Sequence, residues 1–489
     1  MASVPKQHNS TANTPRCPPP AGLKALIDKL LEHYPDQPNP LQVTTVLKYW
    51  LGGQDPLDYI SMFSNRGDVT KKIPPHWFYV SFGLSDLHGD GRVHVLDNED
   101  SEIQSRSGMG FELTFRLLKT KEELKEEEDN PGKRIRPPTW PANLMQNLAR
   151  YCFRTGNRLC FGDNIPWRKG LDDRFDTPLQ NILIAEDPQL KSMTTPFGSV
   201  DFCQIVGVTY EELEQAARWN GRGVLSYLKQ DIQTGGEWWV TNIDRTLSVF
   251  DIFPERLVTL EEELEREGSD LAGVNAEFTF REIPRPKNRQ MQPKTEESEE
   301  GQELNTLMDS MTLKEERTCK QEEGIGELNS EPTGLSFPVS MSMSGSSLHN
   351  SCPLDDQPDA PDSVTLDGIE LQIAPYAAKY LLLAIKDRIR HGRHFTFKAQ
   401  HLALTFVAES VTGAGVTKEA PYGVIGYWIQ VLITDDLVPR MIEDFKNANL
   451  DRISQLGERR EFEWPDKFLR VVIDHHPHGY MLPPPPMSL

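Results

Sequence analysis

Aromatic side chains divide this chain of 489 residues into two blocks. Its nine tryptophans lie at positions 50, 77, 140, 167, 219, 238, 239, 428 and 464, and from residue 284 to 365 the only aromatic side chain is Phe337. A segment that poor in large apolar groups cannot bury enough surface to offset its chain entropy. We therefore predict an N-terminal domain over residues 22–280, a disordered acidic and serine-rich insert over 283–365 and a C-terminal domain over 366–474, with a disordered tail at 1–21 and a loose proline-rich tail at 475–489.

The overall charge restricts the partners of the chain. It carries 52 Lys+Arg against 73 Asp+Glu, a formal net charge of −21, which repels phosphate backbones and anionic lipid surfaces. No stretch approaches the ~20 apolar residues of a membrane helix, and no apolar signal core follows Met1. We therefore expect an intracellular protein that binds neither nucleic acid nor membrane, with its six cysteines reduced.

Apolar periodicity predicts an α+β fold in both domains. Helical spacing alternates irregularly with the two-residue period of strands, so the pattern favours largely antiparallel sheets over regular βαβ units. In residues 111–117, apolar and polar side chains alternate as in a strand with one face on a core. The predicted helices are 23–33, 42–51, 141–153, 210–219 and 435–446, and the other predicted strands are 77–84, 181–185, 200–208, 238–243, 369–373, 402–407, 428–433 and 468–473.

Sequence motifs whose residue spacing is required by a catalytic mechanism are absent. The sequence has no phosphate-binding GxxxxGK[ST], no GxGxxG after a strand, no GxSxG and no HExxH. His391 and His394 have metal-ligand spacing, but Gly392 between them favours a turn that enters a strand, and a third ligand is missing. The histidines at 475, 476 and 478 in the tail are weaker candidates. We therefore expect no metal and no cofactor.

Three classes of function remain open at this point. Two domains joined by a long insert suit a protein that closes around a partner. A hydrolase would need Asp86, Asp163 and His391 to meet in one cleft, whereas Asp86 and Asp163 also suit turns, where an aspartate bonds its own backbone. A constitutive structural subunit would instead have large permanent apolar interfaces.

Several strings are specific enough to indicate a family. They include YPDQPNPLQV at 34–43, KYWLGG at 48–53, SFGLSDL at 81–87, GFELTFRL at 110–117, EDP at 186–188 and HGRHFT at 391–396. In this order they resemble the Suppressor of fused family of negative regulators of Hedgehog signalling. The resemblance covers both predicted domains and fails in the N-terminal tail and the insert.

The resemblance implies a non-enzymatic protein of cytoplasm and nucleus that binds Gli-type (Ci-like) zinc-finger transcription factors and prevents their nuclear accumulation and activation. In the family, a short Ser-Tyr-Gly-His-Leu motif of the transcription factor lies extended between the two domains and adds a strand to sheet edges on both sides. Unpaired backbone amides at such an edge are satisfied by the peptide, and pockets recognise alternate side chains.

The resemblance also implies which residues line this groove. The family's groove tyrosine falls on Tyr151, and its acidic residue, which bonds the peptide histidine, falls on Asp163. Two edge positions fall on Val274 and Ala276, and a position on the contact strand of the second domain, a leucine in the family, falls on Tyr380. From the residues alone, Tyr151 would be a core residue at helical spacing from Leu148, Asp163 a turn residue, and Val274 and Ala276 ordinary strand residues.

Overall fold

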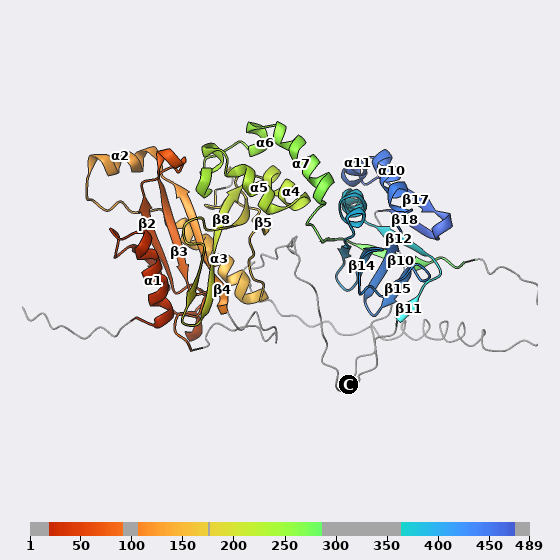
Figure 1. Cartoon of the computed structure of the whole chain (residues 1–489), viewed down its shortest axis with the longest axis horizontal. Coiled ribbons are helices and arrows are strands. Elements are labelled where there is room, and N and C mark those ends of the chain that lie inside the picture. Colours follow the sequence, from red (N-terminus) through yellow and green to blue (C-terminus); the bar gives the residue numbers. More distant parts are fainter. Residues whose placement is uncertain (1–18, 91–105, 175–176, 286–362, 475–489) are drawn as a thin grey trace, which may run out of the picture.

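The computed structural model describes residues 19–90, 106–174, 177–285 and 363–474 (Figure 1). Most of the predicted N-terminal tail, most of the predicted insert, the C-terminal tail and the histidines at 475, 476 and 478 lie outside these residues. Within them, helices and mixed sheets form two α+β bodies, so the predicted fold class is confirmed.

The N-terminal body is built on one eight-stranded sheet. Its strand order is β1-β2-β3-β4-β8-β6-β5, and β7 pairs with β8 off this path. Every pairing is antiparallel except that of β4 with β8, in agreement with the predicted antiparallel sheets. The strands are β1 (Leu41–Thr44), β2 (Tyr59–Asn65), β3 (His76–Phe82), β4 (Arg106–Leu118), β5 (Asn164–Pro166), β6 (Asn181–Glu186), β7 (Ser192–Thr195) and β8 (Gly198–Val208).

Helices cover both faces of this sheet. Helix α1 packs Leu26 and Leu30 on one face, and α3 packs Leu144 and Leu148 on the other, while α4 to α7 form a cluster over β6 and β8. None of the described helices combines the length and the apolar composition needed to span a membrane. The helices are α1 (Ala21–His33), α2 (Lys121–Asp129), α3 (Trp140–Thr155), α4 (Tyr210–Arg218), α5 (Gly221–Leu228), α6 (Val249–Ile252) and α7 (Glu255–Glu267).

The strand predicted over residues 111–117 lies within β4, but both of its faces are buried. Phe111 and Phe115 belong to the core under α3, as the alternation predicted. Glu112, Thr114 and Arg116 on the other face are also fully buried. The alternation predicted that this polar face is exposed to solvent, and this was wrong. Polar residues whose hydrogen-bond partners are buried with them cannot be distinguished from exposed polar residues by the local sequence pattern.

The C-terminal body contains two smaller sheets around one core. A four-stranded sheet has the order β10-β12-β18-β17, and a six-stranded sheet has the order β11-β15-β16-β14-β13-β9. Residues of both sheets and of three helices form a single apolar cluster. The elements are β9 (Gly273–Asn275), β10 (Phe278–Glu282), β11 (Ser363–Thr365), β12 (Ile369–Ile373), β13 (Phe395–Lys398), β14 (Ala403–Ala408), β15 (Tyr422–Ile425), β16 (Trp428–Ile433), β17 (Arg460–Trp464), β18 (Leu469–Ile473), α9 (Lys379–Leu383), α10 (Val438–Ala448) and α11 (Leu450–Leu456).

The domain boundaries differ from those predicted at 280 and 365. Strands β9 and β10, which precede the insert, pair with β13 and β12 of the C-terminal body. Strand β11, predicted as the end of the insert, pairs with β15. Composition located the aromatic-poor segment but could not reveal which sheet the short strands on either side of it would join.

Two further local predictions were wrong. Residues predicted as a helix over 42–51 form the edge strand β1 and a short 3-10 turn that ends at Gly52, whose φ of 92° is left-handed. Residues predicted as a strand over 238–243 form a 3-10 turn and an irregular segment, with only an isolated bridge from Leu117 to Thr241. In both places tertiary contacts override short-range propensity.

The chain passes from one body to the other directly after α7. The Ser269 carbonyl accepts hydrogen bonds from Arg388 at 2.8 Å and from Arg393 at 2.7 Å, and the Ser269 N–H donates to the Asp387 carbonyl at 2.8 Å. The Asp270 N–H donates to the carbonyl of Trp219, at the end of α4, at 2.8 Å. These bonds connect the crossing segment to both bodies.

Candidate peptide-binding edges

Strand β5 forms one end of the N-terminal sheet. It pairs antiparallel with β6, and on its other side no strand of the described residues pairs with it. The turn before it is closed by Asp163, whose carboxylate accepts the Cys160 N–H at 2.7 Å, while the Asp163 N–H donates to the Cys160 carbonyl at 3.0 Å. Asp163 is thus a turn residue, and this turn places its side chain where an open sheet edge begins.

The environment of Asp163 makes its carboxylate readily protonated. Burial raises the pKa of Asp163 to about 6, although the Cys160 N–H and the positive charge of Arg222 oppose the rise. The group is therefore ionised at neutral pH but lies close to its titration point. Such a carboxylate is a strong acceptor for a donor of similar pKa, such as an imidazole.

Tyr151 lies on the last turn of α3, and its half-buried ring packs against the core under that helix. Its hydroxyl accepts a hydrogen bond from the Asn157 side-chain amide at 2.7 Å. The helix ends at Gly156, and the connection from there leads directly to the turn of Asp163. Tyr151 and Asp163 therefore flank one short connection, which precedes β5.

Strand β9 forms one end of the six-stranded sheet in the other body. It pairs in parallel with β13, and no described strand pairs with its second side. The Ala276 N–H donates to Lys398 of the β13 side at 3.0 Å, and the Ala272 carbonyl accepts from Thr396 at 2.9 Å. Because backbone groups alternate in direction along a strand, those of Gly273 and Asn275 face the open side.

The side chains of Val274 and Ala276 point toward the core. Ala276 is buried, and Val274 is partly buried against the apolar cluster of the C-terminal body. At this edge a peptide would therefore meet the backbone of β9, with Val274 and Ala276 fixing the strand to its own sheet.

Tyr380 does not lie on a strand. Pro375 begins a 3-10 turn, and Tyr380 follows in helix α9, where Leu381 is buried and the Tyr380 ring packs partly against the core. The neighbouring Tyr376 is half-exposed, and its hydroxyl accepts the N–H of Glu277, two residues after the end of β9, at 2.8 Å. The resemblance placed Tyr380 on a contact strand, whereas the residue that touches the end of β9 is Tyr376.

The residues considered for a hydrolase are not joined to one another. Asp86 accepts the N–H groups of His88 and Gly89 in its own turn, and no hydrogen bond or ion pair among the described residues joins Asp86, Asp163 and His391. His391 ends a 3-10 turn before β13, as Gly392 predicted. In the described ranges, no three His, Cys, Asp or Glu side chains could share a metal ion.

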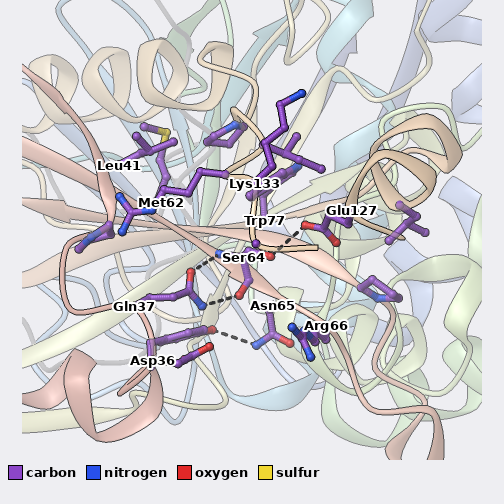
Figure 2. Close-up of a pocket in the computed structure, with 18 of the residues that line it drawn as sticks. Asp36, Gln37, Leu41, Met62, Ser64, Asn65, Arg66, Trp77, Glu127 and Lys133 are labelled. Carbon is purple, nitrogen blue, oxygen red and sulfur yellow. Dashed lines mark hydrogen bonds between the residues drawn. The ribbon is translucent and has the colours of Figure 1, made fainter. Parts of the chain in front are cut away.

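A pocket of about 840 Å³ opens at another part of the N-terminal body, between the end of β2 and α2 (Figure 2). Figure 2 shows that Gln37 and Ser64 bond each other, through the Gln37 amide to the Ser64 carbonyl at 2.8 Å and the Ser64 N–H to Gln37 at 2.9 Å. The Ser64 hydroxyl also donates to Glu127 at 3.2 Å. The pocket contains none of the predicted site residues.

Neither of the two edge strands could be predicted from its sequence pattern. β5 and β9 have three residues each, which is too short for alternation to be recognised, and only the turn-forming Gly162 and Asp163 announced the first of them. Figure 1 shows β5 on the side of the N-terminal body that faces the C-terminal body. The fold thus defines a two-domain α+β protein with an open sheet edge in each domain.

Comparisons with known proteins identify the family. A family model described as "Suppressor of fused protein (SUFU)" matches residues 53–246, and one described as "Suppressor of Fused Gli/Ci N terminal binding domain" matches residues 258–473. The chain belongs to the Suppressor of fused family.

Individual relatives match over most of the chain. The Suppressor of fused homolog of Mus musculus is 39% identical over 467 residues, 92% of this chain and 91% of its own length. The Homo sapiens homolog is 38% identical over the same number of residues. The crystal structure of Drosophila Suppressor of Fused is 62% identical, covers 94% of this chain and 98% of its own, and has a TM-score of 0.77.

Proposed function

We propose that this protein is a non-enzymatic negative regulator of Hedgehog signalling that binds and sequesters Gli-type transcription factors, in cytoplasm and nucleus. One observation carries the proposal: each domain ends in an open sheet edge, β5 or β9, in a chain whose C-terminal part matches a domain described by its binding of Gli/Ci. An open edge presents unpaired backbone donors and acceptors, which an extended peptide can satisfy.

In this proposal an extended Ser-Tyr-Gly-His-Leu segment lies between the domains. At the β5 edge its histidine donates a hydrogen bond to the Asp163 carboxylate, and the Tyr151 ring covers one side of the peptide. Removing one partner of a charge-assisted hydrogen bond in a closed groove weakens binding by about 2–5 kcal/mol.

At the β9 edge the contacts are backbone bonds to Gly273 and Asn275. Val274 and Ala276 hold this strand in place through the core, and Tyr376 fixes its end. Because the two edges belong to different bodies, binding one peptide at both would link the domains and raise affinity beyond that of either edge alone.

The test is calorimetric titration of the full chain with a Ser-Tyr-Gly-His-Leu peptide. Asp163→Arg should abolish binding, because it removes the acceptor and places a cation beside the imidazole, while circular dichroism shows an intact fold. Asp28→Arg makes the same charge change on the exposed face of α1 and should bind as the wild type does. Equal affinities for wild type and a folded Asp163→Arg would refute the assignment of the groove.

Cellular action is tested with the same pair of variants. When a Gli-type factor is expressed together with the wild type, fractionation should find it retained in the cytoplasm, and with Asp163→Arg in the nucleus. Retention by both variants would contradict sequestration through this groove.

A further inference from the structure

Three arginines from separate parts of the sequence gather around the connection that leads to β5. They are Arg106 at the start of β4, Arg158 after α3 and Arg222 in the first turn of α5. A methyl group added at Gly110 would lie 2.7 Å from Arg158 Nη2 and 3.0 Å from Arg106 Cδ, so both side chains cross over this glycine.

The third arginine lies on the turn of Asp163. Arg222 Nε donates to the Phe161 carbonyl at 3.0 Å, and a methyl group at Gly162 would lie 3.0 Å from Arg222 Cγ. The charges of all three arginines act on the Cys160 thiol, which is also close enough to feel Asp163. Arg222 thus lies on the turn of Asp163, whereas Arg106 and Arg158 lie over β4, and the charges of all three reach Cys160 in that turn.

Two of these cations lack a partner within the described ranges. Neither the Arg106 nor the Arg158 side chain has an ion pair or hydrogen bond there, and Arg158 Nε is buried without an acceptor. Burial and the nearby charge of Arg106 lower the pKa of Arg158. Two carboxylates act on the cluster through space without an ion pair to it among the described residues: Asp201, which accepts the Ser192 hydroxyl at 2.6 Å, and Asp163, which accepts the Cys160 N–H.

This arrangement differs from a purely structural arginine. In the same sheet, Arg116 is fully buried but donates to Gln204 and to both carboxylate oxygens of Asp187. A half-buried cation beside a second cation, with no acceptor for its Nε, is unfavourable unless an anion joins it.

We propose that Arg106, Arg158 and Arg222 form an anion subsite, which takes an acidic or phosphorylated side chain of the same peptide that binds at β5. The inference rests on the proposed function and adds to it a charged residue next to the motif. Guanidinium groups suit this role, because their paired N–H donors match the oxygens of a carboxylate or a phosphate.

The first experiment needs no peptide. Inorganic phosphate, compared with chloride at equal ionic strength, should raise the thermal midpoint of the full chain. Arg158→Gln should lose this gain. Arg66→Gln, the same change on an exposed arginine beside the pocket of Figure 2, should keep it. An equal effect of phosphate on all three proteins would overturn the subsite.

The thermal stability of Arg158→Gln tests whether Arg158 has a purely structural role. Without ligand, Arg158→Gln should have a thermal midpoint no lower than that of the wild type, because it removes a half-buried cation that lies beside the Arg106 cation and has no ion pair among the described residues. A midpoint several degrees lower would show that Arg158 supports the fold, and would count against the proposal.

The second experiment varies the peptide. Ser-Tyr-Gly-His-Leu peptides with glutamate, phosphoserine or glutamine at the residue before or after the motif are titrated into the wild type and Arg158→Gln. At one of the two positions an anionic residue should bind about tenfold more tightly than glutamine to the wild type, and equally to Arg158→Gln. Comparison of glutamate with phosphoserine shows which anion the subsite prefers.

The outcomes separate this proposal from the function on which it rests. If all peptides bind the wild type equally well, the subsite is refuted and the groove remains. If no peptide binds, the proposed function fails, and the phosphate experiment alone decides whether the arginines hold an anion.

Discussion

Arg116 Nη2 lies 3.0 Å from both carboxylate oxygens of Asp187, and neither side chain is exposed to solvent. Asp187 also accepts the Thr114 hydroxyl and the N–H groups of Gln189 and Leu190. The pair therefore closes a fully bonded polar layer beneath the sheet. The two residues are 71 positions apart in the sequence, and their ion pair connects β4 to the segment after β6.

Removing one member of this pair should be strongly destabilising. Asp187→Ala leaves the Arg116 charge buried without its partner, which costs about 3–5 kcal/mol. Urea unfolding followed by circular dichroism measures the loss. The exposed Asp28→Ala should change stability by less than about 0.5 kcal/mol. A similarly small change in Asp187→Ala would show that water or another group compensates Arg116.

His76 should make the protein sensitive to acid. Burial, with the charge of Arg116, lowers the pKa of His76 to about 3, against an ordinary value of 6.5. Between these values only the unfolded chain binds the proton, so stability is lost as the pH falls from 6.5 toward 3. His76→Gln should reduce the slope of unfolding free energy by about 1.4 kcal/mol per pH unit between pH ~4 and ~6. An unchanged slope would mean that His76 is protonated in the folded state.

Peptide affinity should depend on the ionisation of Asp163. Because the pKa of Asp163 is about 6, acidification below this value protonates the acceptor, and affinity should fall by up to about tenfold per pH unit. Calorimetric titrations from pH 5 to 7.5 give the profile. Asp163→Asn, which cannot titrate, should lack this acidic limb. The same limb in both proteins would assign the titration to another group.

The segment rich in acidic residues and serine should be dispensable for folding. Replacing residues 290–358, which lie outside the described residues, with a short Gly-Ser linker should leave the thermal midpoint unchanged, because this stretch has one aromatic residue with which to form a core. Scanning calorimetry on the shortened chain makes the comparison. A loss of more than a few kcal/mol would show that the segment packs against a domain.

Sequence patterns predicted the long elements of this fold better than the short ones. Helix α3 and strand β4 were found because each repeats its period several times. The edge strands β5 and β9 are too short to show a period, and the short apolar run of β1 fits the spacing of a helix as well as that of a strand. Length therefore decided which elements could be predicted.

The turn that carries Asp163 could be predicted from residue type, whereas the side chains that gather around this turn could not. The turn at Asp163 was recognised from residue type, because aspartate bonds its own backbone there. Arg106, Arg158 and Arg222 gave no signal, since only the folded sheet brings them together. The burial of the polar face of β4 could not be predicted for the same reason, because the partner of Arg116 lies 71 residues away in the sequence.

Strand β10 pairs with β12 along five residues, from Phe278 opposite Ile373 to Glu282 opposite Ile369. The long segment 286–362, which lies outside the described residues, therefore connects two strands of the C-terminal domain, β10 and β11. A proteolytic cut in this segment would divide the domain into two fragments. The five paired residues of β10 and β12 and the shared core would hold these fragments in a noncovalent complex. Fragment complementation is therefore open to this protein, whereas a C-terminal fragment that begins after the cut would expose the bare flanks of β12 and β13.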